Sequence, residues 1–177
     1  YDSISNSKAL DAFEISYGVR ALPTYDFEKA NVIVSFSADF LGDWQGGGFS
    51  KGYAKTRVPK NGKMSKHYQI EANMSLSGAN ADTRIPLKPS LQKKALLRIY
   101  DLISGQNSGV KLDDKLDAKL KSISDSLLNS NGNGIYISGI DDVGAQLISL
   151  KINQLIKSKV INVQKLNYTS QGNDQKV

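Results

Sequence analysis

Residues 64–90, MSKHYQIEANMSLSGANADTRIPLKPS, hold the densest group of side chains that could bind a ligand. The stretch reads as a strand, then a polar loop, then the start of a helix. Loops that follow strands often carry binding sites, and carboxylates, amides, hydroxyls and guanidinium groups can hold a polar ligand by hydrogen bonds. The sequence therefore raises the question of whether this loop binds a ligand or is the remnant of a site. The side chains concerned are Glu71, Asn73, Ser77, Asn80, Asp82 and Arg84.

Acid–base and nucleophilic chemistry finds little support elsewhere in the chain. His67 is the single histidine, and the sequence offers no partner for it in a Ser-His-Asp relay or a metal site. We therefore expect His67 to be an ordinary hydrogen-bonded side chain without a catalytic role. The paired carboxylates at 113–114 and 141–142 lie on or before helices, whereas catalytic pairs usually converge from separate elements.

The sequence excludes metal sites that need cysteine and gives little support to a phosphate-binding loop. The chain has no cysteine, so it cannot ligate an iron–sulfur cluster or a thiolate zinc ion within this segment. Gly46, Gly47 and Gly48 fit neither phosphate-loop pattern, because no Gly-Lys-Ser/Thr follows and no GxGxxG opens a helix.

Positive charge is concentrated in one stretch. The chain has 23 basic and 17 acidic residues, a formal charge of +6. No acidic residue lies between Asp43 and Glu71. Such a stretch can meet phosphates, an acidic partner or anionic lipid, or can simply be a solvated loop. It lacks the interleaved aromatic residues that stack single-stranded bases. Its cations are Lys51, Lys55, Arg57, Lys60, Lys63 and Lys66.

Apolar patterns predict four strands, near 31–36, 67–72, 135–138 and 160–163. The run ANVIVSF is typical of a strand buried on both faces, whereas HYQIEANMSL alternates and predicts a half-buried strand. We expect the second strand to end near Glu71, because Asn73, Ser75 and the following Ser77 suit a loop. Pro23 is expected to break the chain.

Helical periodicity predicts helices at 6–17, 49–56, 90–105, 111–128 and 142–157. Ser90 is the expected N-cap of the third helix and Gly105 its C-terminal stop. Asp141 or Asp142 is expected to cap the last helix.

Strands separated by long helices predict an α/β fold with a doubly wound, mainly parallel sheet and helices on both faces. Ligands of such sheets bind at the carboxyl ends of the strands, which here are the loops 37–48, 72–86 and 139–142. We expect residues 1–168 to form one domain and 169–177 a disordered tail. No apolar run reaches 18 residues, so no membrane span is expected. The chain does not begin with Met, and we expect it to be a piece of a larger protein.

Two segments, NVIVSFSADFLGDW and MSKHYQIEANMSLSGANADTRIPLKPSLQKKALLRIYDLI, resemble the molybdopterin oxidoreductase superfamily. In its cofactor-binding members one strand ends in a Gly-x-Asn-Pro-like turn and the next in an Asp-Pro-Arg-like turn. An Ala-Asp then precedes a Pro-x-(Lys/Arg)-Pro-Gly segment that opens a helix. This chain keeps the Ala-Asp and the Pro-x-Lys-Pro segment, with Ser90 in place of the glycine. It departs at the other two, where SADF (37–40) and EANM (71–74) stand.

At these two altered turns the chain resembles one branch of the superfamily, the iron–sulfur subunit of alternative complex III. That complex is a respiratory quinol-oxidising complex of Bacteroidetes-like bacteria. The resemblance is strong over 24–103 and weaker over 134–163, and residues 105–133 match nothing that we can name. It implies a Rossmann-like, molybdopterin-type domain that has lost its cofactor, with iron–sulfur clusters elsewhere in the parent chain. It also implies other subunits of a membrane complex as partners, no nucleic acid, and a location on the periplasmic side of the inner membrane. The vestigial cofactor residues would be Ser37, Asp39, Glu71, Asn73, Asn80, Asp82, Arg84 and Lys88.

Two alternatives remain open from the sequence. The segment could be a genuine molybdopterin guanine dinucleotide-binding domain with altered turns. It could instead be an anion- or nucleic-acid-binding module that uses the basic stretch 51–66.

Overall fold

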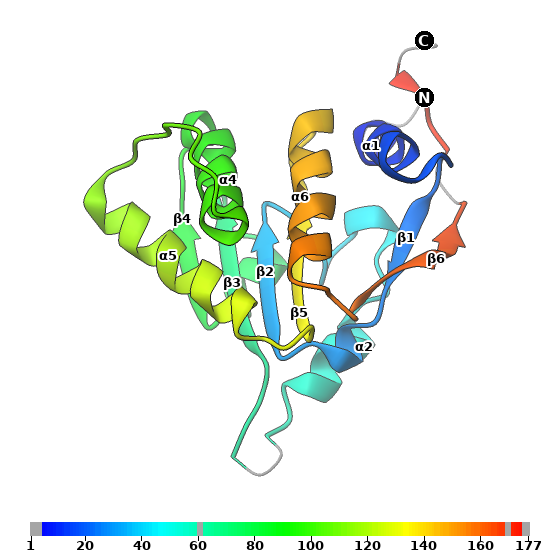
Figure 1. Ribbon diagram of the computed structural model, residues 1–177. Helices are drawn as coiled ribbons and strands as arrows, with labels where there is room; N and C mark the ends of the chain where they lie inside the picture. The colour runs from blue at the N-terminus through cyan, green and yellow to red at the C-terminus, as the bar shows by residue number, and fades with distance from the viewer. Residues whose placement is uncertain (1–4, 60–61, 169–170, 175–177) are drawn as a thin grey trace.

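The computed structural model describes residues 5–59, 62–168 and 171–174. Its centre is a parallel sheet of four strands in the order β4-β3-β2-β5 (Figure 1). The strands are β2 (Val32–Phe36), β3 (Lys66–Glu71), β4 (Thr83–Pro86) and β5 (Gly134–Ser138). The predicted α/β class, with a doubly wound parallel sheet and helices on both faces, is confirmed.

Three long helices cover one face of the sheet: α4 (Pro89–Ser104), α5 (Asp114–Leu128) and α6 (Val143–Leu155). Val34, Phe36 and Ile70 point from the strands into this layer and pack against Leu96 and Leu120 in the larger core cluster. The predicted helical stripes of α4 and α5 thus supply the buried surface. Asp113 and Asp142 cap α5 and α6 by accepting bonds from the amides of Leu116 and Ala145.

Shorter elements cover the other face. The helix α2 (Ser50–Thr56) and the 3-10 turn η1 (Phe27–Lys29) pack there, with the turn η2 (Trp44–Gly46) nearby. Phe27 and Phe40 stack with ring centroids 4.8 Å apart, and Tyr53 meets Phe40 edge to face. Because this layer covers β3, residues 67–71 are buried on both faces. The half-buried strand expected from the alternation is therefore wrong, although its end at Glu71 is confirmed.

The last predicted strand does not join the parallel sheet. Residues Ile161–Asn167 form β6, which pairs antiparallel with β1 (Leu22–Tyr25) in a separate two-stranded sheet. Pro23 lies inside β1 rather than breaking it, and the register shifts directly after it. Helix α1 (Ser7–Tyr17) packs beside this ribbon and against α6, with Phe13 in a third apolar cluster.

Two further local expectations were wrong. The loop predicted at 72–86 contains the short helix α3 (Leu76–Ala79) and the strand β4. Ser90 is not the N-cap of α4, because the helix begins one residue earlier with Pro89 at its first position and Lys88 at its cap. Proline suits that position, since its missing N–H would be unpaired there in any case.

The predicted tail is described only at 171–174; residues 169–170 and 175–177 lie outside the described residues. Arg20 donates to the carbonyl of Gly172 over 2.7 Å, and the amide of Asp174 donates to Ser7 Oγ. These described residues therefore lie against α1.

The outer edge of β5 is closed by side chains instead of a fifth strand. The Asn153 amide of α6 accepts from the Tyr136 N–H over 3.0 Å and donates to the Tyr136 carbonyl over 2.7 Å. Asn153 is buried, so without it the Tyr136 N–H would lose its partner and the Tyr136 carbonyl would keep only a long bond of 3.5 Å from the Ser149 hydroxyl. Ser158 Oγ and Trp44 Nε1 satisfy the carbonyls of Gly134 and Ser138 on the same strand. Asn153 thus ends the sheet at β5, because it mimics the peptide group of a neighbouring strand.

We predict that Asn153→Leu lowers the free energy of unfolding by about 3 kcal/mol, because it leaves the buried Tyr136 N–H unpaired and removes the shorter of the two bonds to the Tyr136 carbonyl. Urea denaturation followed by circular dichroism measures the change. Lys151→Ala, at an exposed position on the same helix, serves as the control and is expected to stay within about 0.5 kcal/mol of wild type. Equal destabilisation of the two variants would contradict the capping role.

Candidate functional site

A cleft of about 420 Å³ opens at the carboxyl ends of β2 and β5. After β2 the chain adds β3 and β4 on one side, then crosses back to place β5 on the other side. This reversal of strand order is the position at which open α/β sheets bind ligands. The cleft is therefore the first place to look for a cofactor site.

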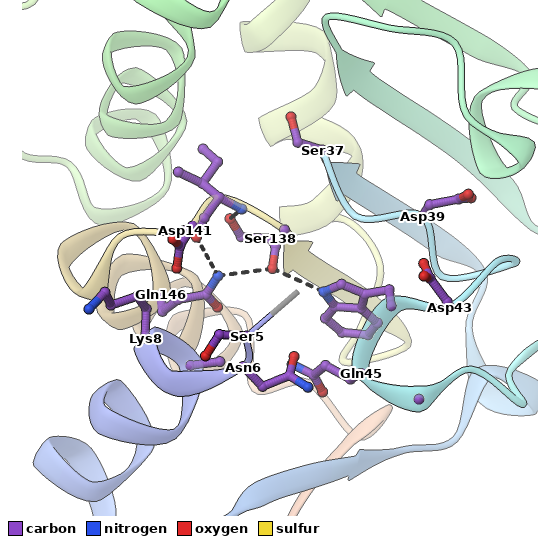
Figure 2. Close-up of a pocket in the computed structure, with 15 residues that line it drawn as sticks. Ser5, Asn6, Lys8, Ser37, Asp39, Asp43, Gln45, Ser138, Asp141 and Gln146 are labelled. Carbon is purple, nitrogen blue, oxygen red and sulfur yellow. Dashed lines mark hydrogen bonds between the residues drawn. The ribbon is translucent and has the colours of Figure 1, made fainter. Parts of the chain in front are cut away.

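The lining of the cleft carries more negative than positive charge. Asp39 and Asp43 follow β2, Asp141 follows β5, and Lys8 of α1 is the one cation among the lining residues. Figure 2 shows Ser5, Asn6 and Lys8 on the α1 side, with Asp39 and Asp43 on the opposite side. Three carboxylates against one ammonium disfavour an anionic ligand such as a pyrophosphate.

Asp39 connects the loop after β2 to the loop after β3. Its Oδ1 accepts from the amide and the hydroxyl of Ser77, over 2.8 and 2.7 Å. The Ser77 hydroxyl in turn accepts from the Leu41 N–H over 2.9 Å. The amides of Gly42 and Trp44 also donate to the Asp39 carbonyl. The amides of Leu41, Gly42 and Trp44, which could otherwise cradle a phosphate, are therefore occupied by protein oxygens.

Glu71 ends β3 as a buried carboxylate with four donors. Arg84 Nε of β4 donates to its Oε1 over 2.6 Å, and Ser75 Oγ donates to its Oε2 over 2.6 Å. Gln69 Nε2 and the Ser75 N–H complete the set. Burial alone would raise the pKa of Glu71, but the hydrogen bonds from Ser75, Arg84 and Gln69 outweigh it and hold the pKa below its usual value.

Gly78 makes room for this carboxylate. A Cβ atom at residue 78 would lie 1.9 Å from Glu71 Oε1, far inside contact distance. With any larger residue at this position, the Glu71 carboxylate would have to move away from its donors for α3 to keep its place.

A chain of buried polar groups continues from Glu71 along the same face of β3. Gln69 Oε1 lies 3.2 Å from His67 Nε2, and His67 Nδ1 lies 3.2 Å from the Tyr53 hydroxyl. That hydroxyl also donates to the Asn80 carbonyl over 3.0 Å. Burial lowers the pKa of His67 to about 4, so the imidazole is neutral at pH 7. His67 is fully buried and does not line the cleft.

Asp82 forms a second ion pair, at the amino ends of β3 and β4 and thus at the opposite end of the sheet from Glu71. Arg57 donates to both of its oxygens over 2.7 Å, and the His67 amide donates to Oδ2. Burial would raise the pKa of Asp82, but the bonds from Arg57 and from the His67 amide lower it below its usual value. Asp82 thus fixes the loop after α2 to the start of β4.

The remaining predicted site residues are not brought together. Ser37 lines the cleft with a left-handed backbone (φ 56°), and its hydroxyl has no hydrogen-bond partner in the described part of the chain. Asn73 and Lys88 are exposed and do not line the cleft. Asn80 caps α3, and its side chain donates to the Leu76 carbonyl. Of the eight predicted residues, only Ser37 and Asp39 line the cleft.

Sequence reasoning missed several cleft residues. Asp43 and Asp141 lie in loops that were expected at the carboxyl edge, so their position could have been found by treating every acid there as a candidate. Lys8 and Gln146 come from α1 and α6. No sequence signal places α1 at this edge, because its position depends on packing against α6 and β6.

The residues present do not fit a pterin dinucleotide. The cleft is acidic, and the amides of Leu41, Gly42 and Trp44 are occupied. Asp39 is bonded to Ser77, and Glu71 and Arg84 are bonded to each other. No cluster of three or more metal-ligating side chains suited to a metal ion occurs within residues 5–59, 62–168 and 171–174.

Comparison with protein-family models and with curated proteins finds no match to this chain. Among the helices that the structure describes, none is both long and apolar enough to cross a membrane.

We predict that Glu71→Gln lowers the free energy of unfolding by about 3 kcal/mol, because Arg84 loses its buried counter-charge and the new amide faces donors. Urea denaturation measures the effect. Asn73→Ala, two residues further along and exposed, is the matched control and is expected to be neutral within about 0.5 kcal/mol. An unchanged urea midpoint for Glu71→Gln would show that the carboxylate does not organise this end of the sheet.

We also predict a pH dependence that comes from His67. Its pKa is about 4 in the folded protein and about 6.5 in the unfolded chain. The unfolded chain therefore binds more protons between these values, and stability falls as pH is lowered. Between about pH 6.5 and about pH 5 the loss should be roughly 1.5 kcal/mol.

Urea titrations at several pH values test this dependence. Because the chain has a single histidine, His67→Gln should remove the slope in this window. A variant that keeps the wild-type slope would assign it to another group.

Proposed function

We propose that this chain is a cofactor-free, molybdopterin-type structural domain of the iron–sulfur subunit of a respiratory quinol-oxidising complex of the alternative complex III type. The resemblance of the segments around 31–44 and 64–103 to that subunit supports the proposal. So does the parallel sheet, which brings these two segments side by side as β2 and β3.

The observation that carries the proposal is the set of hydrogen bonds that Asp39 and Glu71 accept from protein groups. These residues stand in the two turns that depart from the cofactor-binding pattern. Each carboxylate accepts hydrogen bonds from the segment after β3, Asp39 from Ser77 and Glu71 from Ser75. The turns therefore hold the fold together where cofactor-binding relatives would hold a ligand.

In this role the domain contributes no redox group of its own. Its cleft does not match an anionic dinucleotide, and electrons would pass through iron–sulfur clusters elsewhere in the parent chain. The domain would act as a rigid scaffold against which other parts of a membrane-bound complex assemble on the periplasmic side. A genuine dinucleotide-binding domain is less well supported, because the cleft has the wrong charge for a pyrophosphate.

The test is purification of the complex through an affinity tag on the parent subunit. We expect quinol oxidation to purify with the subunit, with iron present and molybdenum and pterin absent by metal analysis and fluorescence. Calorimetry of the 177-residue chain with guanine nucleotides should show no binding.

Stoichiometric molybdenum in the purified subunit would overturn the cofactor-free proposal. Nucleotide binding at about micromolar Kd that is lost in Arg84→Met would do the same. Absence of the chain from any quinol-oxidising membrane fraction would overturn the assignment to a respiratory complex.

A further inference from the structure

The cleft at the carboxyl ends of β2 and β5 is acidic in a chain that is basic as a whole. The formal charge of the chain is +6, yet the lining of the cleft carries three carboxylates and one ammonium group. That ammonium group, of Lys8, lies 3.8 Å from the carboxylate of Asp174, which offsets its charge. The local potential in the cleft is therefore negative, and it attracts cations against the net charge of the chain.

Two of the three carboxylates are available to a ligand. The side chains of Asp43 and Asp141 are exposed, and neither has a hydrogen bond or an ion pair within the described part of the chain. Asp39, by contrast, accepts two hydrogen bonds from Ser77 through its Oδ1. A cation can thus pair with Asp43 and Asp141 without breaking a contact of the fold.

These two carboxylates belong to different walls of the cleft. Asp43 follows β2 and Asp141 follows β5, and Figure 2 shows them on opposite sides of the cleft. Among the described residues, the aspartates of the cleft do not converge as the ligands of one metal ion would. Carboxylates on opposite walls suit a ligand that carries two separated positive charges.

Apolar side chains line the cleft beside both carboxylates. Trp44, next to Asp43 in the chain, reaches across to the end of β5 and donates from Nε1 to the Ser138 carbonyl over 3.3 Å. The indole thus spans from the loop of Asp43 to the strand that leads to Asp141. Ile140 lines the cleft on the β5 side. Methylene groups can pack on such a surface, and an indole ring also attracts ammonium groups.

We propose that this cleft binds a small aliphatic polyamine, whose ammonium groups pair with Asp43 and Asp141. Its methylene chain lies against Trp44 and Ile140. The cleft volume of about 420 Å³ is ample for such a molecule. A lysine side chain of a partner protein has the same chemistry, but it carries one ammonium group and reaches one wall only. The proposal rests on the cleft alone and does not depend on the assignment of the chain to a respiratory complex.

The test uses the whole 177-residue chain, whose single tryptophan is Trp44, so that intrinsic fluorescence reports on the cleft directly. Spermidine is titrated at low ionic strength, where salt screens the charges least, and calorimetry gives a second readout. We expect a saturable change in fluorescence with a Kd of about 0.1 mM, because ion pairs between exposed groups are weak. Butylamine, which has one ammonium group, should bind about tenfold more weakly.

Substitutions then place the ligand. Asp43→Asn and Asp141→Asn should each weaken spermidine binding about fivefold, because each removes one of the two ion pairs. Asp125→Asn, at an exposed position on α5 that does not line the cleft, is the charge-matched control and should change Kd less than about twofold. Circular dichroism checks that each variant is folded.

Several outcomes would overturn the proposal. One is a fluorescence signal that spermidine leaves unchanged up to about 10 mM, or equal affinity for spermidine and butylamine. Another is an equal loss of affinity in Asp125→Asn, which would assign the effect to the overall charge of the chain. Magnesium chloride that binds as tightly as spermidine, with the same dependence on Asp43 and Asp141, would assign the cleft to a divalent cation. A trilysine peptide that binds more tightly than spermidine would assign it to a basic partner protein.

Discussion

The buried carboxylate of Glu71 is the charge around which the carboxyl end of the sheet is organised. A carboxylate without partners at this depth would be too costly, so Arg84, Ser75 and Gln69 must all reach it. Arg84 lies on β4, so the ion pair holds the edge strand to its neighbour. Ser75 caps α3, so the same carboxylate holds that helix on the sheet. From Gln69 the chain of hydrogen bonds passes through His67 to Tyr53, which places α2.

Two surfaces follow from this arrangement, and they differ in character. The cleft at the switch point lies where the fold would present a cofactor, but its carboxylates and occupied amides oppose an anionic ligand. The second surface is an open groove of about 400 Å³ on the α2 side of the sheet, and it is lined in part by Tyr53, Arg57 and Asn80, which take part in the buried polar contacts. The contact between Asp39 and Ser77 is common to both surfaces, because Asp39 lines the cleft and Ser77 lies on α3 next to the groove residue Leu76.

At the other edge of the sheet, no further strand pairs with β5. A doubly wound sheet can add strands at either edge, but the outer edge of β5 is occupied by the amide of Asn153. The strand that follows α6 turns away and pairs with β1 instead. That ribbon and α6 hold α1, whose preceding residues form one wall of the cleft. The acidic cleft thus depends on a side chain that closes the sheet.

Local pattern in the sequence determined β2, β3, β5 and the long helices, because their apolar residues recur with the period of the element and their caps are adjacent in the chain. It also placed the end of β3 near Glu71, because the polar residues Asn73, Ser75 and Ser77 suit a loop although the alternation continues past Glu71. The sequence could not place β4, since four residues ending in proline carry too little periodicity to stand apart from a loop. Nor could it assign β6 to a separate sheet, because Asn153 closes β5 only once α6 is packed. Only the tertiary structure decided the roles of the candidate residues Asp39, Glu71, Asp82 and Arg84. The role of a polar side chain depends on which partner comes within about 3 Å of it, and the partners of these four residues lie on other elements.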